Sequence, residues 1–197
     1  MIILFGLAGS GKGTQGKALS EIFGWRWLSV GEAIRQTGKF KEITDRGELV
    51  PDEKVIELMN NQIEKAELEG FNVILDGYPR DVVQAEYLVN NMAEKIEGAI
   101  ILEVPKEELY ERLALRGRDD DLEKDSINRR FEVFEQNIDL ILPLLEAKNI
   151  PIKRVDGVGS VEEVTARLVE IVEKIAPSAT IQKDDVNGGE IEKSYGE

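Results

Sequence analysis

Residues 2–14 read IILFGLAGSGKGT, an apolar run followed by a glycine-rich segment that indicates the fold of the chain. The first four of these residues are wholly apolar and predict a buried strand, whereas the proline-free residues 14–23 predict a helix. A strand, a glycine-rich loop and a helix, in this order, are what a phosphate-binding P-loop requires. Without side chains, Gly9, Gly11 and Gly13 let backbone N–H groups converge on anionic oxygens at a helix N-terminus. The sequence therefore predicts a nucleotide site here.

The polar side chains of this loop suggest how it meets phosphates. Lys12 would reach the terminal phosphates as a point charge, and a hydroxyl from Ser10 or Thr14 would serve a bound Mg²⁺ or the phosphates. The general P-loop pattern places Ser or Thr directly after the lysine, whereas Gly13 stands there in this chain. The loop therefore predicts nucleotide binding without choosing between a switch, a motor and a kinase.

Composition excludes several classes of function. Among 197 residues, 39 are acidic and 25 basic, and the formal net charge is −14, which disfavours broad binding to nucleic acid or anionic membranes. The chain has no cysteine and no histidine, which excludes disulfides, Cys/His zinc sites and imidazole bases. No apolar run has the length of a membrane span, and no signal peptide is recognisable. We therefore expect a soluble cytoplasmic protein.

Short apolar segments alternate with longer segments of helical spacing along the rest of the chain. This alternation predicts an α/β protein with the P-loop NTPase fold, in which helices cover both faces of a five-stranded parallel sheet. From residue 177 onward the chain is polar and aperiodic, so we expect one domain over 1–176 and a disordered tail over 177–197. The further strands are expected at 27–30, 72–75, 99–102 and 152–155, and the further helices at 51–67, 82–92, 106–115, 122–147 and 161–175.

A second polar constellation follows the buried strand that ends at Leu75. Asp76 comes directly after it, where a carboxylate could hold Mg²⁺ directly or through water. Gly77 and Pro79 predict a tight turn, and Arg80 then offers a planar fork suited to a second phosphate. An ordinary strand exit would explain these residues less completely than a second phosphate site.

Arginines recur further along the chain. Arg112 and Arg116 are four residues apart on a predicted helix, so they share one face. Taken singly, each arginine would be explained as part of a solvated, salt-bridged surface. In a strongly acidic chain, however, the whole set favours a site for two polyanions. The set comprises Arg35, Arg80, Arg112, Arg116, Arg118, Arg129 and Arg130.

Five segments, in this order, resemble the nucleoside monophosphate kinase family, and most closely its adenylate kinases with a short lid. The resemblance covers nearly all of residues 1–175. It implies a core domain with a monophosphate-binding segment at about 30–59 and a lid at about 117–123. The five segments are residues 9–15, 28–32 with Arg35, 47–52, 76–80 with Gln84, and 117–121.

The resemblance implies that the chain transfers the terminal phosphoryl group of ATP to AMP, giving two ADP. Arg112 would stack on the donor base, Gly159 would offer its backbone there, and Arg116 would join the loop at the phosphates. The implied Mg²⁺ would be held by Asp76 through water, with Thr14 as a further candidate. The implied ATP-binding residues are Gly9, Ser10, Gly11, Lys12, Gly13, Thr14, Arg112, Arg116 and Gly159.

For the acceptor, the resemblance implies that Arg35 and Arg80 clamp the phosphate and that Gln84 reads the base. The implied AMP-binding residues are Val30, Gly31, Arg35, Glu48, Leu49, Val50, Gly77, Tyr78, Pro79, Arg80 and Gln84. A monophosphate is largely dianionic near neutral pH and already a nucleophile, so a chain without histidine needs no general base.

The resemblance also implies a catalytic set of positive charges around the transferring group. Arg118 and one of the pair Arg129/Arg130 would close on that group. The apolar phase through Ile127 and Phe131 favours Arg130 and leaves Arg129 open. The implied catalytic residues are Lys12, Arg80, Arg116, Arg118, Arg130 and Arg129.

The chain departs from the adenylate kinase pattern in three places. The lid is a short turn without metal-binding cysteines, so no zinc is expected. The segment between Arg35 and Gly47 is short. Val30 replaces the threonine usual in adenylate kinases, which leaves base selectivity open.

Competing functions share parts of the same motifs. A UMP/CMP-type pyrimidine kinase would keep nearly every arginine, although Gln84 favours adenine. A P-loop kinase for a small metabolite would keep the glycine-rich loop, and a nucleotide-regulated interaction module would keep the binding residues but could lose the catalytic arginines. The family suggests a monomer.

Overall fold

The computed structural model describes residues 1–117, 121 and 123–179. The predictions for Arg118, for most of the lid and for residues 180–197 of the tail lie outside these described residues. The first residues of the tail that are described pack on the core, because the Ser178 hydroxyl donates to Glu97 at 2.7 Å and accepts from Asn72 at 3.0 Å.

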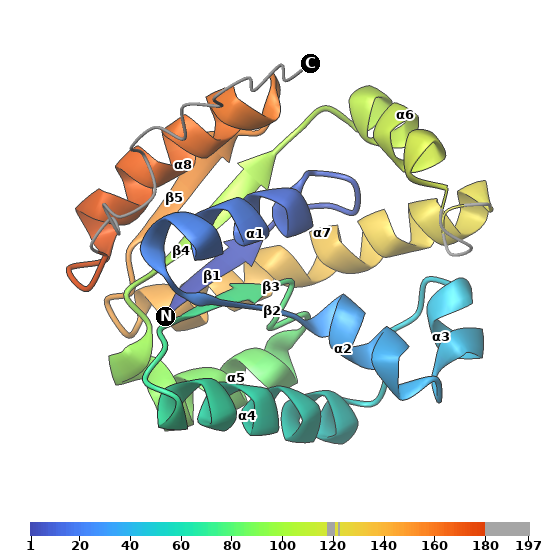
Figure 1. Cartoon of the computed structure of the whole chain (residues 1–197). Helices are drawn as coiled ribbons and strands as arrows, with labels where there is room; N and C mark the ends of the chain where they lie inside the picture. The colour runs from blue at the N-terminus through green and yellow to red at the C-terminus, as the bar shows by residue number, and fades with distance from the viewer. Residues whose placement is uncertain (118–120, 122, 180–197) are drawn as a thin grey trace, which may run out of the picture.

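A five-stranded parallel sheet forms the centre of the molecule (Figure 1). Its order is β2-β3-β1-β4-β5. The predicted five-stranded parallel sheet is thereby confirmed. The strands are β1 (Ile2–Phe5), β2 (Arg26–Ser29), β3 (Val73–Asp76), β4 (Gly98–Glu103) and β5 (Ile152–Asp156).

The register of the sheet places the functional segments at one edge. Leu4 of β1 and Ser29 of β2 both pair with Asp76 of β3. Parallel strands end at the same edge of the sheet, where ligands of open α/β folds bind. The glycine-rich loop after β1, the segment after β2 and the Asp76 turn are therefore neighbours.

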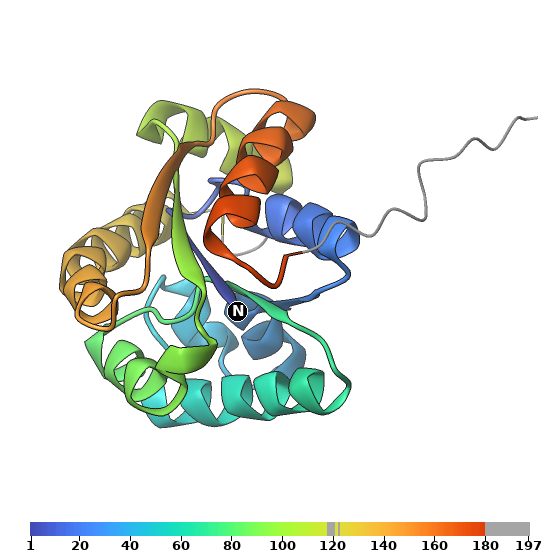
Figure 2. The same cartoon turned by 90° about the vertical axis from the view of Figure 1, so that its left-hand side faces the viewer.

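Helices cover both faces of the sheet, as predicted. Figure 2 shows the sheet nearly edge-on, with α1 and α8 on one side and the other long helices opposite. Side chains of β1 alternate accordingly, because Ile2 and Leu4 belong to one apolar cluster and Ile3 and Phe5 to another. The covering helices are α1 (Lys12–Phe23), α8 (Val161–Ile175), α4 (Asp52–Leu68), α5 (Val82–Met92) and α7 (Lys124–Glu146).

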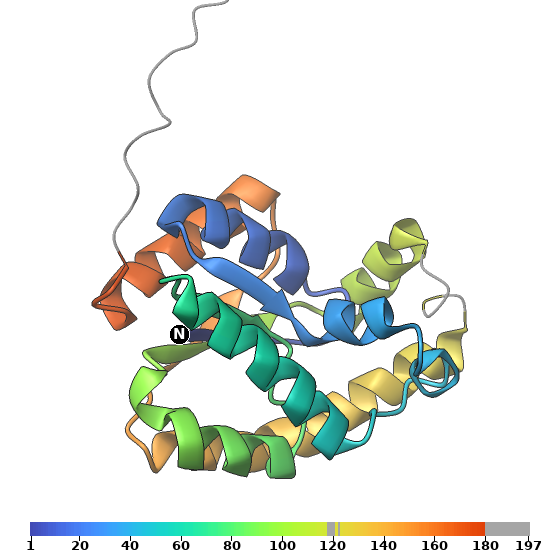
Figure 3. The same cartoon turned by 60° about the horizontal axis from the view of Figure 1, so that its bottom comes forward.

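Smaller elements surround the end of the sheet that carries the glycine-rich loop. Figure 3 shows α2 (Val30–Thr37) and α3 (Lys41–Asp45) facing α6 (Lys106–Arg116) across this end. A 3₁₀ turn (Ala93–Lys95) follows α5. The prediction that residue 30 ends a strand is wrong. The Ser29 side chain accepts the N–H of Glu32 and caps a helix that starts at residue 30.

Helix α7 links the core to the cavity end of the molecule. Ile127 and Phe131, near its start, pack with Leu109 and Leu113 of α6. Further along, its apolar side chains join the cluster beneath the sheet. Ser160 and Glu163 form a capping box at the start of α8. Among the described residues, no helix is both long enough and apolar enough to cross a membrane.

Candidate active site

A cavity of about 720 Å³ opens at the carboxyl edge of the sheet. This volume lies within the range of small-molecule sites. Elements far apart in the sequence contribute to its wall, including α1, α2, α6 and α7. The predicted site residues that line it are Gly9, Ser10, Gly11, Lys12, Gly13, Thr14, Gly31, Arg35, Glu48, Leu49, Asp76, Gly77, Pro79, Arg80, Arg112, Arg116, Arg130 and Gly159.

The glycine-rich loop adopts a conformation that requires glycine at two positions. Gly9 has φ 86° and Gly11 has φ 96°, both in the left-handed region that glycine enters at little cost. Gly11 is the residue before α1 and brings no side chain to cap it. The first backbone N–H groups of α1 are therefore open toward the cavity, which makes this end of the helix suited to phosphate oxygens.

The ammonium group of Lys12 lies inside the curve of this loop. Its Nζ donates to the carbonyl oxygens of Gly6 at 2.7 Å and Leu7 at 2.9 Å. Burial lowers the pKa of Lys12 to about 8, and the charges of Arg80 and other cavity arginines act in the same direction, against the opposing effect of Asp76. Lys12 is therefore mostly protonated at neutral pH and loses its proton as the pH rises through about 8.

Binding of ATP is therefore expected to weaken as the pH rises through about 8. The protonated amine attracts the phosphates, and above its pKa the empty site must take up a proton to form the same complex. The loss approaches about ten-fold per pH unit when only the charged form binds. Calorimetric measurement of ATP dissociation constants across this range tests the expectation, with Lys12→Met as the control that lacks the trend. An affinity independent of pH would contradict the assignment.

Asp76 has the surroundings expected of a metal-associated carboxylate. It is buried except for 7% of its surface, and the indole Nε1 of Trp27 donates to its Oδ2 at 3.2 Å. No cluster of three or more His, Cys, Asp or Glu residues that could hold a metal occurs in the described part of the chain. One carboxylate together with substrate phosphates is the donor set typical of Mg²⁺, so these residues fit that ion.

Two guanidinium groups converge beside Gly31. A Cβ placed on Gly31 would lie 3.3 Å from Nη1 of Arg35 and 3.3 Å from Nη2 of Arg80. The Nε of Arg80 donates to the Gly77 carbonyl at 3.1 Å, which fixes the direction of the side chain. Two such forks around one small space are suited to a single phosphate.

A second pair of arginines is joined through Asp121. Its carboxylate, which is fully buried, accepts from Nε of Arg116 at 2.6 Å and from Nη2 of Arg130 at 2.8 Å. Burial alone would raise the pKa of Asp121, but the hydrogen bonds from both arginines outweigh burial and hold the pKa below its usual value. Asp121 therefore fixes both guanidinium groups at the cavity wall.

The structure separates the two arginines that the sequence left open. Arg130 lines the cavity, and its side chain is 17% exposed. Arg129 lies outside the cavity lining, is 52% exposed and pairs with Glu132 at 3.5 Å. Of the two, Arg130 is the one placed to reach a ligand.

Arg112 of α6 and Gly159, which precedes α8, both line the cavity. The Nη2 of Arg112 donates to the Gly157 carbonyl at 3.0 Å, and Glu108 forms an ion pair with the same guanidinium group. Arg112 therefore contacts the turn after β5, two residues before Gly159, the other residue that the resemblance assigns to the donor base.

Four predicted acceptor residues lie behind the cavity wall instead of lining it: Val30, Val50, Tyr78 and Gln84. The Gln84 side chain is fully buried, and its Nε2 donates to Asp52 and Asp81, both at 2.8 Å. Its Oε1 accepts the backbone N–H of Arg80 at 3.0 Å. In this conformation Gln84 braces the Arg80 turn.

Sequence reasoning missed two residues that shape the site. Trp27, which carries no motif of the sequence analysis, lines the cavity and donates a hydrogen bond to Asp76. Asp121 was included only as the last residue of segment 117–121, without a role of its own, yet it forms ion pairs with Arg116 and Arg130. A signal existed for Asp121, because an acidic residue five positions after Arg116 can pair with it when the helix ends between them.

The fold and the site define the class of P-loop nucleotide-binding proteins, here with two pairs of arginines, Arg35 with Arg80 and Arg116 with Arg130, in one cavity. Residues 4–150 match the family model described as adenylate kinase. The chain is 35% identical over 182 residues to the adenylate kinase of Thermus thermophilus, covering 85% of this chain and 94% of that protein. It is 38% identical over 178 residues to the adenylate kinase of a Synechococcus species, covering 85% and 95%. The adenylate kinase of Archaeoglobus fulgidus is 32% identical over 217 residues, covering 88% and 98%. The chain belongs to the adenylate kinase family.

Proposed function

We propose that this chain catalyses the reversible, Mg²⁺-dependent reaction of ATP and AMP to two ADP, with the roles of individual residues given below. Phosphotransfer between these nucleotides is the activity of the adenylate kinase family to which the chain belongs. The observation that carries the residue roles is the convergence of Lys12, Arg35, Arg80, Arg116 and Arg130 on one cavity in a chain of net charge −14.

The donor phosphates bind the open amides of the glycine-rich loop and Lys12, whose ammonium exchanges its loop carbonyl partners for phosphate oxygens. The acceptor phosphate binds the fork formed by Arg35 and Arg80 beside Gly31. Arg116 and Arg130 line the cavity and are fixed by Asp121. In the proposal they stabilise the charge that spreads over the transferring group. Arg118 joins them in the proposal and lies outside the described residues.

Catalysis in this proposal is positioning and charge neutralisation. Holding both reacting groups at near-attack distance can contribute about 7–11 kcal/mol. No side chain needs to remove a proton, because the acceptor phosphate is already largely ionised near neutral pH. Asp76 would hold Mg²⁺ through its water, with Thr14 as a further candidate ligand. When bound, Mg²⁺ supplies charge neutralisation at the donor phosphates.

AMP is the acceptor that the proposal favours over a pyrimidine monophosphate. The family match supports it, and the buried amide of Gln84 can donate and accept along a purine edge. Because both amide hydrogens of Gln84 are donated to Asp52 and Asp81, direct contact with the base requires exchange of at least one partner. Val30, fully buried beside Gly77, shapes the pocket from behind.

The proposal also includes the finer assignments that the sequence suggested. Residues 1–176 form one enzyme domain, in which about 30–59 receive the monophosphate and about 117–123 form a short lid. The enzyme acts as a cytoplasmic monomer without zinc. Its substrates are ATP and AMP, and the net charge of −14 supports the absence of nucleic-acid partners.

One panel of reactions tests the proposed function. ATP with Mg²⁺ is mixed with AMP, CMP, UMP, dCMP or GMP, and diphosphate formation is followed. We expect the largest kcat/KM with AMP and loss of transfer when Mg²⁺ is removed. A zinc-selective chelator at constant Mg²⁺ is the control and is expected to change nothing. A preference for UMP or CMP would contradict the choice of acceptor, and absence of any transfer would contradict the activity.

A further inference from the structure

Trp27 projects from β2 toward Asp76, the carboxylate proposed to hold Mg²⁺. It pairs in register with Ile74, which lies two residues before Asp76 on β3. Residues two apart on a strand share a face, so the indole and the Asp76 carboxylate lie on the same side of the sheet. The indole Nε1 donates to Oδ2 of Asp76 at 3.2 Å, and both residues line the cavity.

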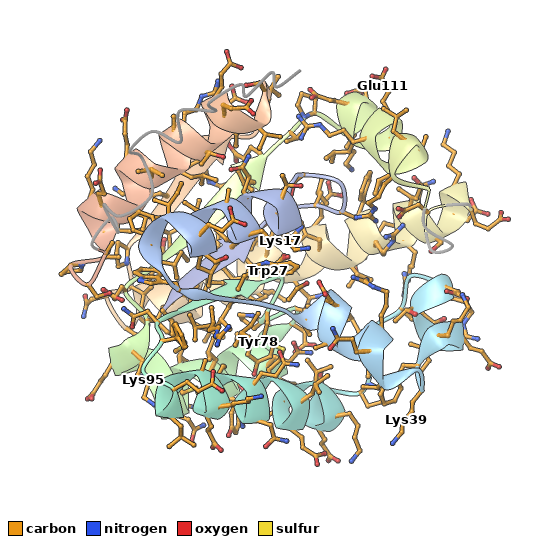
Figure 4. The ribbon with its side chains drawn as sticks, viewed as in Figure 1. Lys17, Trp27, Lys39, Tyr78, Lys95 and Glu111 are labelled. Carbon is orange, nitrogen blue, oxygen red and sulfur yellow. The ribbon has the colours of Figure 1, made fainter. Side chains whose placement is uncertain are left out.

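The indole is held in place from the side of α1. A Cβ placed on Gly16 would lie 2.3 Å from Cδ1 and 2.5 Å from Nε1 of Trp27, a distance at which real atoms clash. The absence of a side chain at position 16 therefore allows the indole ring to pack directly against α1. The ammonium of Lys17 lies 4.7 Å from the ring centroid. Figure 4 shows Lys17 and Trp27 next to each other between α1 and β2.

We propose that Trp27 is a positioning residue for Asp76, and that Gly16 keeps its indole in position. The N–H of the indole fixes one carboxylate oxygen, Oδ2, so that the other remains available for the water of a bound Mg²⁺. Without that hydrogen bond the carboxylate can rotate, and its interaction with the metal weakens. This role rests on the proposed function of Asp76 and extends it to a residue outside the phosphate-binding segments.

Trp27→Phe tests the role, because phenylalanine keeps an aromatic ring and removes the N–H. Outer-shell partners of metal sites typically contribute 10–100-fold in metal affinity, and we expect about ten-fold here. The apparent Mg²⁺ constant for activation rises by this factor, and kcat recovers at high Mg²⁺. In calorimetric titrations, the gain in ADP affinity on adding Mg²⁺ shrinks by the same factor, whereas ADP affinity without metal is unchanged.

Trp25→Phe is the matched control. Trp25 is buried against Phe23 in the apolar cluster on the same face, and its replacement is expected to leave the Mg²⁺ dependence unchanged. An unchanged Mg²⁺ dependence in Trp27→Phe would overturn the proposal. An equal loss of ADP affinity with and without metal would also overturn it, because the indole would then act only by packing.

Gly16→Ala is a second, independent variant should Trp27→Phe fold poorly. The added methyl group displaces the indole and is expected to reproduce the Mg²⁺ defect. The double variant Gly16→Ala/Trp27→Phe is expected to show no further loss, because both changes remove the same hydrogen bond. A full additive loss would contradict the proposal. The titrations with ADP and Mg²⁺ need no turnover, so a chain that failed to transfer phosphate would still give a result for Trp27.

Discussion

Replacing Lys12 with methionine is expected to lower kcat for phosphoryl transfer by about a thousand-fold, the upper range for removing one preorganised electrostatic donor. The ammonium of Lys12 is a positive charge inside the curve of the glycine-rich loop, held there by the carbonyl oxygens of Gly6 and Leu7. Methionine has a similar length and no charge, so the change removes attraction to the phosphates while the loop keeps its glycine-determined path. Steady-state kinetics with ATP, Mg²⁺ and AMP measure the effect.

Lys54→Met is the control for this substitution. Lys54 is exposed on α4 and pairs with Glu57 at 3.1 Å, an interaction that contributes little in water. Its loss is expected to leave both kcat and thermal stability nearly unchanged. Lys12→Met with wild-type transfer would remove Lys12 from the mechanism. A Lys12→Met variant that failed to fold would have a lowered melting temperature. Loss of catalysis can therefore be distinguished from loss of folding.

Replacing Arg80 with alanine is expected to lower the transfer rate by about 10³-fold, at the lower end of the range for a single phosphate-stabilising arginine. Arg80 shares the space beside Gly31 with Arg35, and its Nε is fixed by the Gly77 carbonyl. Alanine leaves only the guanidinium group of Arg35 to bind the acceptor phosphate. We therefore expect the KM for AMP to rise while kcat falls. Arg80→Lys keeps the charge and loses the fork, and its rate is expected to fall between those of the wild type and Arg80→Ala.

Arg154→Ala is the matched control, because Arg154 is an exposed arginine of β5 that pairs with Glu103 outside the cavity lining. It is expected to transfer phosphate at the wild-type rate. Should Arg80→Ala raise the KM for ATP and leave that for AMP unchanged, Arg80 would belong to the donor site and the proposed assignment would be wrong.

The fold was predictable from the sequence because the apolar runs, the helical spacing and the glycine-rich loop all indicated the same α/β arrangement. Short apolar runs with intervening helical spacing indicated the parallel sheet, and the helix expected at 161–175 has the same bounds in the structure. The boundary at residue 30 was wrong because Val30 favours strands by propensity. The hydrogen bond between Ser29 and the N–H of Glu32 starts a helix there, and local capping outweighed propensity.

The site was predictable where backbone conformation or charge made a residue type necessary. Gly9 and Gly11 have positive φ, and the cavity arginines were already unusual in an acidic chain. Contacts between residues distant in sequence left no such signal. Trp27 meets Asp76 only because β2 lies beside β3, and the buried bond of Gln84 to Asp52 depends on the packing of α4 against α5.

We propose that one cavity holds two polyanions on fixed positive groups. The most direct measurement is calorimetric binding of a molecule in which two adenosines are joined by a chain of five phosphates, which spans both proposed phosphate sites. The claim predicts that this molecule binds far more tightly than ATP or AMP, competes with both, and loses most of that advantage in Arg80→Ala. The proposal would be contradicted if this molecule bound no more tightly than ATP and left AMP free to bind at the same time.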